Sequence, residues 1–107
     1  MTKTEFTKAL NALHKGNIRV DCIDFMHDVT RLSVDLCTKL VVSLWGCSAS
    51  KSFGNNMYDL LEAAADADSS VQFTPKVKTH SCTIYIIYPD DHAAAFALYK
   101  IKQYSIK

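Results

Sequence analysis

The pattern of apolar and polar residues predicts one long helix over residues 21–45, around which the rest of the chain is expected to pack. At about 100° per residue, most apolar side chains of this stretch fall on one arc wider than half of the helix circumference. Leu36 lies at the centre of the arc, and charged and hydroxyl side chains occupy the opposite strip. Because the arc is so wide, we expect this helix, roughly 36 Å long, to be packed on at least two sides.

A competing interpretation ends this helix near Thr38. Val42 and Trp45 fall outside the apolar arc, so residues 40–45 also fit a short buried strand. The pattern leaves both assignments open for this stretch.

The N-terminal residues predict a first helix with recognisable signals at both ends. Thr2 and Glu5 form a capping box, and Gly16 is expected to end the helix in the left-handed conformation. Residues 17–20 fit a brief strand, and Asp21 is expected to cap the long helix.

Two further helices are predicted in the second half of the chain. Gly46 is expected to close the long helix, and residues 46–56 to form a polar loop. Asn56 then caps a helix over residues 57–67, whose alanines favour helix. Nearer the C-terminus, an aspartate at position 90 or 91 is expected to cap a last helix that runs to about residue 104.

The period of the pattern changes from helical to alternating at Ser69, which predicts two strands. Residues 71–77 alternate between apolar and polar side chains, and Pro75 places this strand at a sheet edge because proline has no amide donor. Residues 83–88 are apolar on both faces, as in a covered or central strand, and residues 78–81 turn the chain between the two. The predicted fold class is α+β: a small single domain, residues 1–107, with a long central amphipathic helix, two or three further helices and a small antiparallel hairpin.

Charge is divided along the chain more than its net value of +1 suggests. Residues 1–20 carry a net charge of +3, residues 21–68 carry −5, and residues 69–107 carry +3. Basic ends and an acidic middle are expected to complement each other within the fold, and the alternative is two patches for different partners.

The sequence predicts a cytoplasmic protein without a membrane segment. No apolar run approaches the roughly 20 residues that cross a bilayer, and the N-terminus lacks the apolar core of a signal peptide. All four cysteines are accordingly expected to be free thiols. Cys22 and Cys37 would lie about 22 Å apart on one straight helix, too far for a disulfide, and Cys47, in a polar loop, is expected to react first.

Catalytic chemistry has few candidates. The three glycines are widely spaced, so no loop is expected to hold a phosphate, and no familiar hydrolase or metalloprotease motif occurs. Cys47 is the best candidate nucleophile, but it follows a helix C-terminus, whose negative end raises the pKa of a thiol. The chain is therefore interpreted as not an enzyme. A small enzyme that uses Cys47, or the cluster Asp24, His27 and Asp28, is the second alternative.

Neither metal nor cofactor binding is predicted. The cluster of Asp24, His27 and Asp28 is explained by a solvated polar strip in which Arg31 neutralises Asp28. A second group of residue types that bind zinc does not have the spacing of a zinc module. That group is His80, Cys82 and His92.

The predicted hairpin suggests nucleic-acid binding as an alternative function. Lys76, Lys78 and His80 surround its tip, and Tyr85 shares a strand face with Thr83 and Ile87. The order helix, short strand, two helices and hairpin resembles that of a winged helix, a resemblance of element order only. The helix that would enter a groove carries acidic residues that repel phosphate: Asp59, Glu62, Asp66 and Asp68.

The leading hypothesis is a small protein-binding module or inhibitor that acts by occupying a surface of a macromolecular partner. Small chains without motifs are often accessory proteins, including those of phages and mobile elements. Trp45, Phe53 and Tyr58 are the predicted aromatic anchors. The hairpin residues complete the predicted partner-binding set: Lys76, Lys78, His80 and Tyr85. The oligomeric state is not predicted.

Overall fold

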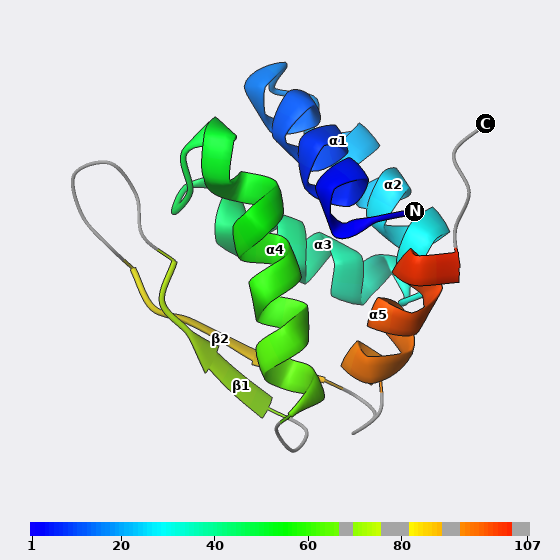
Figure 1. Cartoon of the computed structure of the whole chain (residues 1–107). Helices are drawn as coiled ribbons and strands as arrows, with labels where there is room; N and C mark the ends of the chain where they lie inside the picture. The colour runs from blue at the N-terminus through cyan, green and yellow to red at the C-terminus, as the bar shows by residue number, and fades with distance from the viewer. Residues whose placement is uncertain (67–69, 76–81, 89–92, 104–107) are drawn as a thin grey trace.

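Five helices and two strands form an α+β fold in the part of the chain that the computed structural model describes, residues 1–66, 70–75, 82–88 and 93–103 (Figure 1). The predicted fold class is confirmed. The helices are α1 (Lys3–Lys15), α2 (Arg19–Thr30), α3 (Val34–Trp45), α4 (Ser50–Ala65) and α5 (Ala93–Gln103), and the strands are β1 (Ser70–Phe73) and β2 (Ile84–Ile87).

Helix α4 is the centre of the packing. It contacts α1 over most of its first half and also packs against α3, α5 and β1 (Figure 1). Helices α2 and α3 pack on each other, and α5 closes the core against α2 and α4. The largest fully buried side chains come from every helix: Phe6, Leu10, Met26, Leu40, Leu44, Phe53, Met57, Leu60, Leu61 and Ile101.

The predicted long helix is wrong: the stretch forms two helices, α2 and α3, that pack on each other. The chain changes direction at Arg31, whose φ of 63° is left-handed. Residues 40–45 are helical, so the alternative of a buried strand is wrong as well. The apolar arc does identify core residues, because Leu36 and its neighbours on the arc are buried. They are shared between two short helices.

Side-chain hydrogen bonds stabilise this helix break. The Thr30 hydroxyl donates to the Met26 carbonyl (2.6 Å) and accepts from the Leu32 amide (3.2 Å). His27 Nδ1 lies 2.7 Å from the Leu32 carbonyl, and Ser33 Oγ accepts from the Leu36 amide as the N-cap of α3. Backbone groups freed by the break thus find partners, which offsets the cost of about 1–2 kcal/mol of a left-handed residue.

The turn between α1 and α2 differs from the prediction in its details. The capping box of Thr2 and Glu5 is confirmed. Gly16 is the C-cap but has a right-handed φ of −76°, and Asn17 takes the left-handed conformation instead, with φ of 57°. Helix α2 begins at Arg19 after Ile18, so neither the predicted cap at Asp21 nor the brief strand occurs.

Helix α4 begins earlier than predicted, and most of the predicted polar loop is helical. After Gly46, which ends α3 as expected, only a short turn precedes Ser50. Asn56 lies inside α4 and ties it to the turn, since its amide donates to Ser48 Oγ (3.0 Å). Gly54 is buried in the contact with α1, where its amide donates to Asn11 Oδ1. The small and polar residues of this stretch therefore belong to a close contact between α4 and α1 and to the turn before α4.

The two strands pair in antiparallel fashion as a hairpin, with Val71 opposite Ile86 and Gln72 opposite Tyr85. Val71, Ile84 and Ile86 face the core. The expectation that the second strand is covered or central is wrong, because β2 lies in a sheet of two strands and its outer face is exposed. The first strand ends at Phe73, before the buried Pro75. The predicted turn at 78–81, the cap at 90 or 91 and the helix end at 104 lie outside the described residues.

Candidate functional site

A groove runs between helix α3 and strand β2. It consists of two adjoining hollows of about 320 and 430 Å³. Lys39 and Ile87 line both hollows. The remaining lining residues are Ser33, the N-cap of α3, then Asp35, Leu36 and Ser43 of α3, and Tyr85 and Ile86 of β2. We call this surface the α3–β2 groove.

The α3–β2 groove lies along the edge of β2 that does not pair with β1. Successive side chains of a strand point to opposite faces, yet Tyr85, Ile86 and Ile87 all line the groove, which places it at the strand edge. Within the described ranges, β1 is the only strand hydrogen-bonded to β2. The other edge of β2 therefore presents amide and carbonyl groups to this groove.

Helix α3 and strand β2 run in opposite directions along the groove. The N-terminal part of α3, Asp35 and Leu36, lies beside Ile87, and Ser43 lies in the hollow that also includes Tyr85. The disulfide at the far end gives the same orientation, because Cys47 follows α3 and Cys82 precedes β2.

Two large side chains that line the groove are well exposed. Tyr85 and Ile87, on the outer face of β2, are 62% and 63% exposed. Asp35 and Lys39 are also exposed and supply opposite charges one helical turn apart. An apolar strip with polar groups at its rim has the chemistry of a protein-binding surface.

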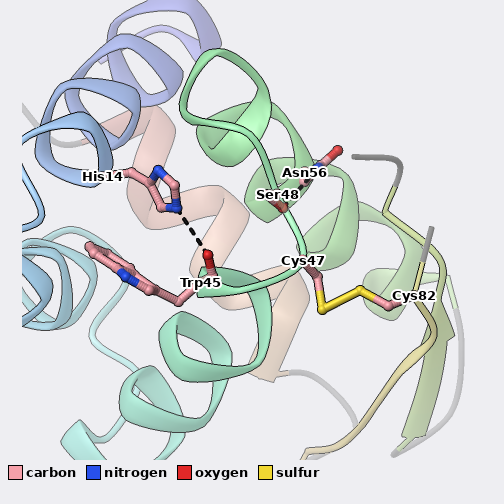
Figure 2. Close-up of a disulfide and its surroundings, with 6 residues drawn as sticks. All are labelled: His14, Trp45, Cys47, Ser48, Asn56 and Cys82. Atoms are coloured by element: carbon pink, nitrogen blue, oxygen red, sulfur yellow. Dashed lines mark hydrogen bonds between the residues drawn. A yellow bond between two sulfur atoms is a disulfide. The ribbon is translucent and has the colours of Figure 1, made fainter. Parts of the chain in front are cut away.

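The disulfide between Cys47 and Cys82 overturns the expectation of four free thiols (Figure 2). It joins Cys47, in the turn between α3 and α4, to Cys82, which precedes β2. The two Cα atoms are 6.0 Å apart, and the two residues are 35 positions apart in the sequence. Figure 2 shows this bond spanning from the helical layer to the hairpin. Cys22 and Cys37 are free and buried, as expected for small core residues.

Two of the three predicted aromatic anchors do not lie on the surface. Phe53 is fully buried and Tyr58 is only 9% exposed, so the expectation that they anchor a partner is wrong. Burial follows from their position on the face of α4 that packs against α1, where Tyr58 meets Phe6 edge to face. Tyr85 is the predicted aromatic residue that is well exposed.

Trp45 is partly buried in a cluster that the sequence did not reveal. His14 stacks on Phe53 and lies 4.6 Å from the Trp45 ring, between ring centroids. The His14 ring also joins three elements. Its Nε2 lies 3.0 Å from the Trp45 carbonyl (Figure 2), and its Nδ1 lies 2.8 Å from Ser50 Oγ. Arg19 lies over the outer face of Trp45, at 5.3 Å. These contacts make Trp45 a part of the helix junction.

The other predicted hairpin residues cannot be placed. Lys76, Lys78 and His80 lie outside the described residues, as does His92. The residues that sequence reasoning missed are Asp35, Lys39 and Ile87, which line the groove. A usable signal was present, since a strand that is apolar on both faces must expose one of them in a hairpin of two strands.

The predicted catalytic and metal candidates have other roles in the structure. Cys47 is bonded to Cys82, so it has no thiol to act as a nucleophile. His27 is engaged at the helix break by the Leu32 carbonyl, while Asp24 and Asp28 are exposed. In the described part of the chain, no three residues of the types that bind metals come together.

Three buried side chains have raised pKa values: Cys22 of α2, Cys37 of α3 and Tyr88, which follows β2. Burial raises the pKa of the Cys37 thiol to about 11, with a smaller opposite effect from the Thr30 hydroxyl. Burial likewise raises the pKa of the Cys22 thiol to about 11, helped by the charge of Asp21. The pKa of Tyr88 is raised by burial and by the nearby Cys37, and its hydroxyl has no hydrogen-bond partner among the described residues. Both thiols are therefore un-ionised at neutral pH.

A second hollow, of about 500 Å³, lies between the end of α1 and the start of α4, with Asn11, Lys15 and Lys51 among its lining residues. Asn11 bridges the two helices there, since its amide donates to the Lys51 carbonyl.

Among the described helices, none has the length and apolar character needed to cross a membrane.

Comparisons with known proteins found no match to this chain among family models, curated proteins or solved structures.

Proposed function

We propose that this chain is a protein-binding module whose contact surface is the α3–β2 groove. The observation that carries the proposal is the pair Tyr85 and Ile87, two large apolar side chains more than half exposed beside an open strand edge. Burying them against a partner would remove apolar area from water, at about 25 cal/mol per Å².

The groove also has groups that would orient a partner. The free edge of β2 can accept an added strand, for which backbone hydrogen bonds supply affinity and neighbouring side chains supply specificity. Asp35 and Lys39 lie at the rim, where charges guide association more than they tighten it. The narrower hypothesis of an inhibitor stays a hypothesis. Nucleic-acid binding is not proposed, because the basic residues on which it depends lie outside the described ranges.

The proposal extends to the compartment in which the protein works. A structural disulfide such as Cys47–Cys82 persists in oxidising surroundings, whereas cytosolic thiols are kept reduced. This favours an oxidising compartment over the cytoplasmic location predicted from the sequence.

Capture of binding proteins from a lysate of the source cells tests the proposed surface. Immobilised wild-type protein is compared with Tyr85→Lys, which places a charge beside the groove, and with Tyr99→Lys as a matched control. Tyr99 of α5 is 55% exposed, close to the value for Tyr85, but does not line the groove. We expect Tyr85→Lys to reduce recovery of a specific protein about 10-fold or more, because central aromatic contacts carry much of the binding energy.

Tyr99→Lys should leave that recovery unchanged. Circular dichroism melts of both variants confirm that each is folded, since both positions are exposed. Equal recovery with Tyr85→Lys and wild type, or equal loss with the two variants, would contradict the proposed surface.

A further inference from the structure

We propose that the Cys47–Cys82 disulfide is a redox switch for the α3–β2 groove: the oxidised pair holds the two walls of the groove together, and reduction of the pair releases them. This inference rests on the proposed function and adds a regulation of the same surface. Binding is then confined to oxidising surroundings, where such a bond persists, and is lost where thiols are kept reduced.

The disulfide joins the two walls of the groove at one end. Cys47 lies two residues after α3, and its amide donates to the Leu44 carbonyl of that helix. Cys82 lies two residues before β2. Ser43 and Tyr85, the groove residues nearest to the two cysteines in the sequence, line the same hollow of about 320 Å³. Release of the disulfide therefore acts first on this hollow.

Packing holds the other end of the groove without the disulfide. Tyr88, which follows β2, is 3% exposed and lies near Cys37 of α3. Before β2, by contrast, Thr83 is exposed and Cys82 is only partly buried. In the described part of the chain, no hydrogen bond or ion pair joins α3 to β2. The disulfide is therefore the attachment that ties the start of β2 to the end of α3.

Reduction of the switch is a two-electron exchange with a dithiol. A thiolate of the dithiol attacks one sulfur of the pair, the S–S bond breaks, and the second sulfur of the dithiol then closes its own disulfide. The dithiol is oxidised, and Cys47 and Cys82 each end as a thiol with one proton. Both cysteines are partly exposed, so a dithiol can reach them.

The two free thiols do not interfere with this exchange. Cys22 and Cys37 are buried, and their raised pKa values keep both un-ionised at neutral pH. Because the thiolate is the attacking form, neither thiol exchanges with the Cys47–Cys82 pair. The switch therefore has two states, oxidised and reduced.

Amide hydrogen exchange in both redox states tests the switch. Dithiothreitol should speed exchange of the Ile84–Ile87 amides that pair with β1 by about 10-fold or more relative to the amides of Leu60 and Leu61, because the released strand opens without the helices. Leu60 and Leu61 are fully buried in α4. A loss of global stability alone does not raise this ratio, since unfolding of the whole chain exposes both sets of amides together.

Two variants serve as controls. Cys47→Ser/Cys82→Ser should show the ratio of reduced wild type with or without dithiothreitol, whereas Cys22→Ala should respond to the dithiol as wild type does, because Cys22 is free. An exchange ratio that is the same in oxidised and reduced wild type would overturn the switch. Loss of the helical circular dichroism signal on reduction would also overturn it, since the bond would then hold the whole fold.

Capture by the double variant separates this inference from the proposed function. We expect Cys47→Ser/Cys82→Ser to recover the protein captured through Tyr85 about 10-fold less than wild type, because a groove with released walls must be ordered on binding. Equal recovery would overturn control of binding by the disulfide and leave the proposed function intact. If wild-type capture does not depend on Tyr85, the groove is not the binding surface and both proposals are wrong.

Discussion

Gly54 sets how closely helices α1 and α4 approach each other. A Cβ atom at this position would lie 2.6 Å from the Thr7 Cα and would also overlap the Thr7 carbonyl. We expect Gly54→Ala to destabilise the fold by about 1–3 kcal/mol, because the clash is with backbone that cannot rotate away. This cost exceeds the gain of about 1 kcal/mol in helix propensity.

Gly46→Ala is the matched control. Gly46 has a right-handed φ of −88°, and a Cβ there meets nothing within 4 Å, so alanine should be neutral or stabilising by up to about 1 kcal/mol. Urea unfolding of the two variants makes the comparison. Equal stabilities would mean that the helices do not cross closely at Gly54.

The same residue explains why the start of α4 was predicted as a loop. Residues 46–56 contain glycine, serine and asparagine at a density typical of turns. In the structure Gly54 permits contact with α1, Asn56 bonds to Ser48, and Asn11 reaches across from α1. The contacts of Gly54 and Lys51 with Asn11 join residues 40 or more positions apart in the sequence, which a local pattern does not contain.

At the scale of elements, the helical spacing of apolar residues predicted the helices but not the break at Arg31. The apolar residues of α2 and α3 fall on one arc of a single helical wheel, so the pattern continues across the break. The signal that could have found the break is Ser33, a favoured N-cap residue followed by Asp35 in the first turn. Two short helices can bury a wide apolar arc against each other, which one helix cannot do.

The Cys47–Cys82 bond is the covalent link between the helices and the hairpin. Replacing both cysteines with serine should lower the free energy of unfolding by about 3–4 kcal/mol, because a closed loop of 35 positions restricts the unfolded chain. Chemical denaturation with and without reductant measures the effect. Reductant should lower the stability of wild type to that of the double variant and leave the double variant unchanged.

A wild-type protein whose stability does not respond to reductant would show that this bond does not form in solution. The sequence could not supply the pairing, since residue 47 is predicted in a polar loop and residue 82 beside the predicted turn at 78–81. Their proximity depends on α3 and β2 running in opposite directions, a tertiary arrangement.

At the scale of the whole molecule, size explains why the long helix does not occur. A helix over residues 21–45 would span roughly 36 Å, while the longest dimension of the fold is 33 Å. A chain of 107 residues has too little material to cover both sides of such a helix. The α+β class and the hairpin, by contrast, depend on local periods, and both were predictable.

The candidate site was predictable only in part. Tyr85 was among the predicted partner-binding residues, and its side chain is 62% exposed on β2. Phe53 falls in the predicted loop and Tyr58 in the predicted helix over residues 57–67, and neither pattern shows that α1 packs over both side chains. The groove itself requires α3 beside β2, a pairing of elements that no motif in the sequence encodes.

Amide hydrogen exchange across β2 tests most directly the claim that its groove edge is an open docking edge. In Ile84–Ile87, alternate amides point away from β1, and we expect them to exchange faster than the amides that hydrogen-bond to β1. Outward amides of β2 that are protected as strongly as the amides paired with β1 would contradict the claim.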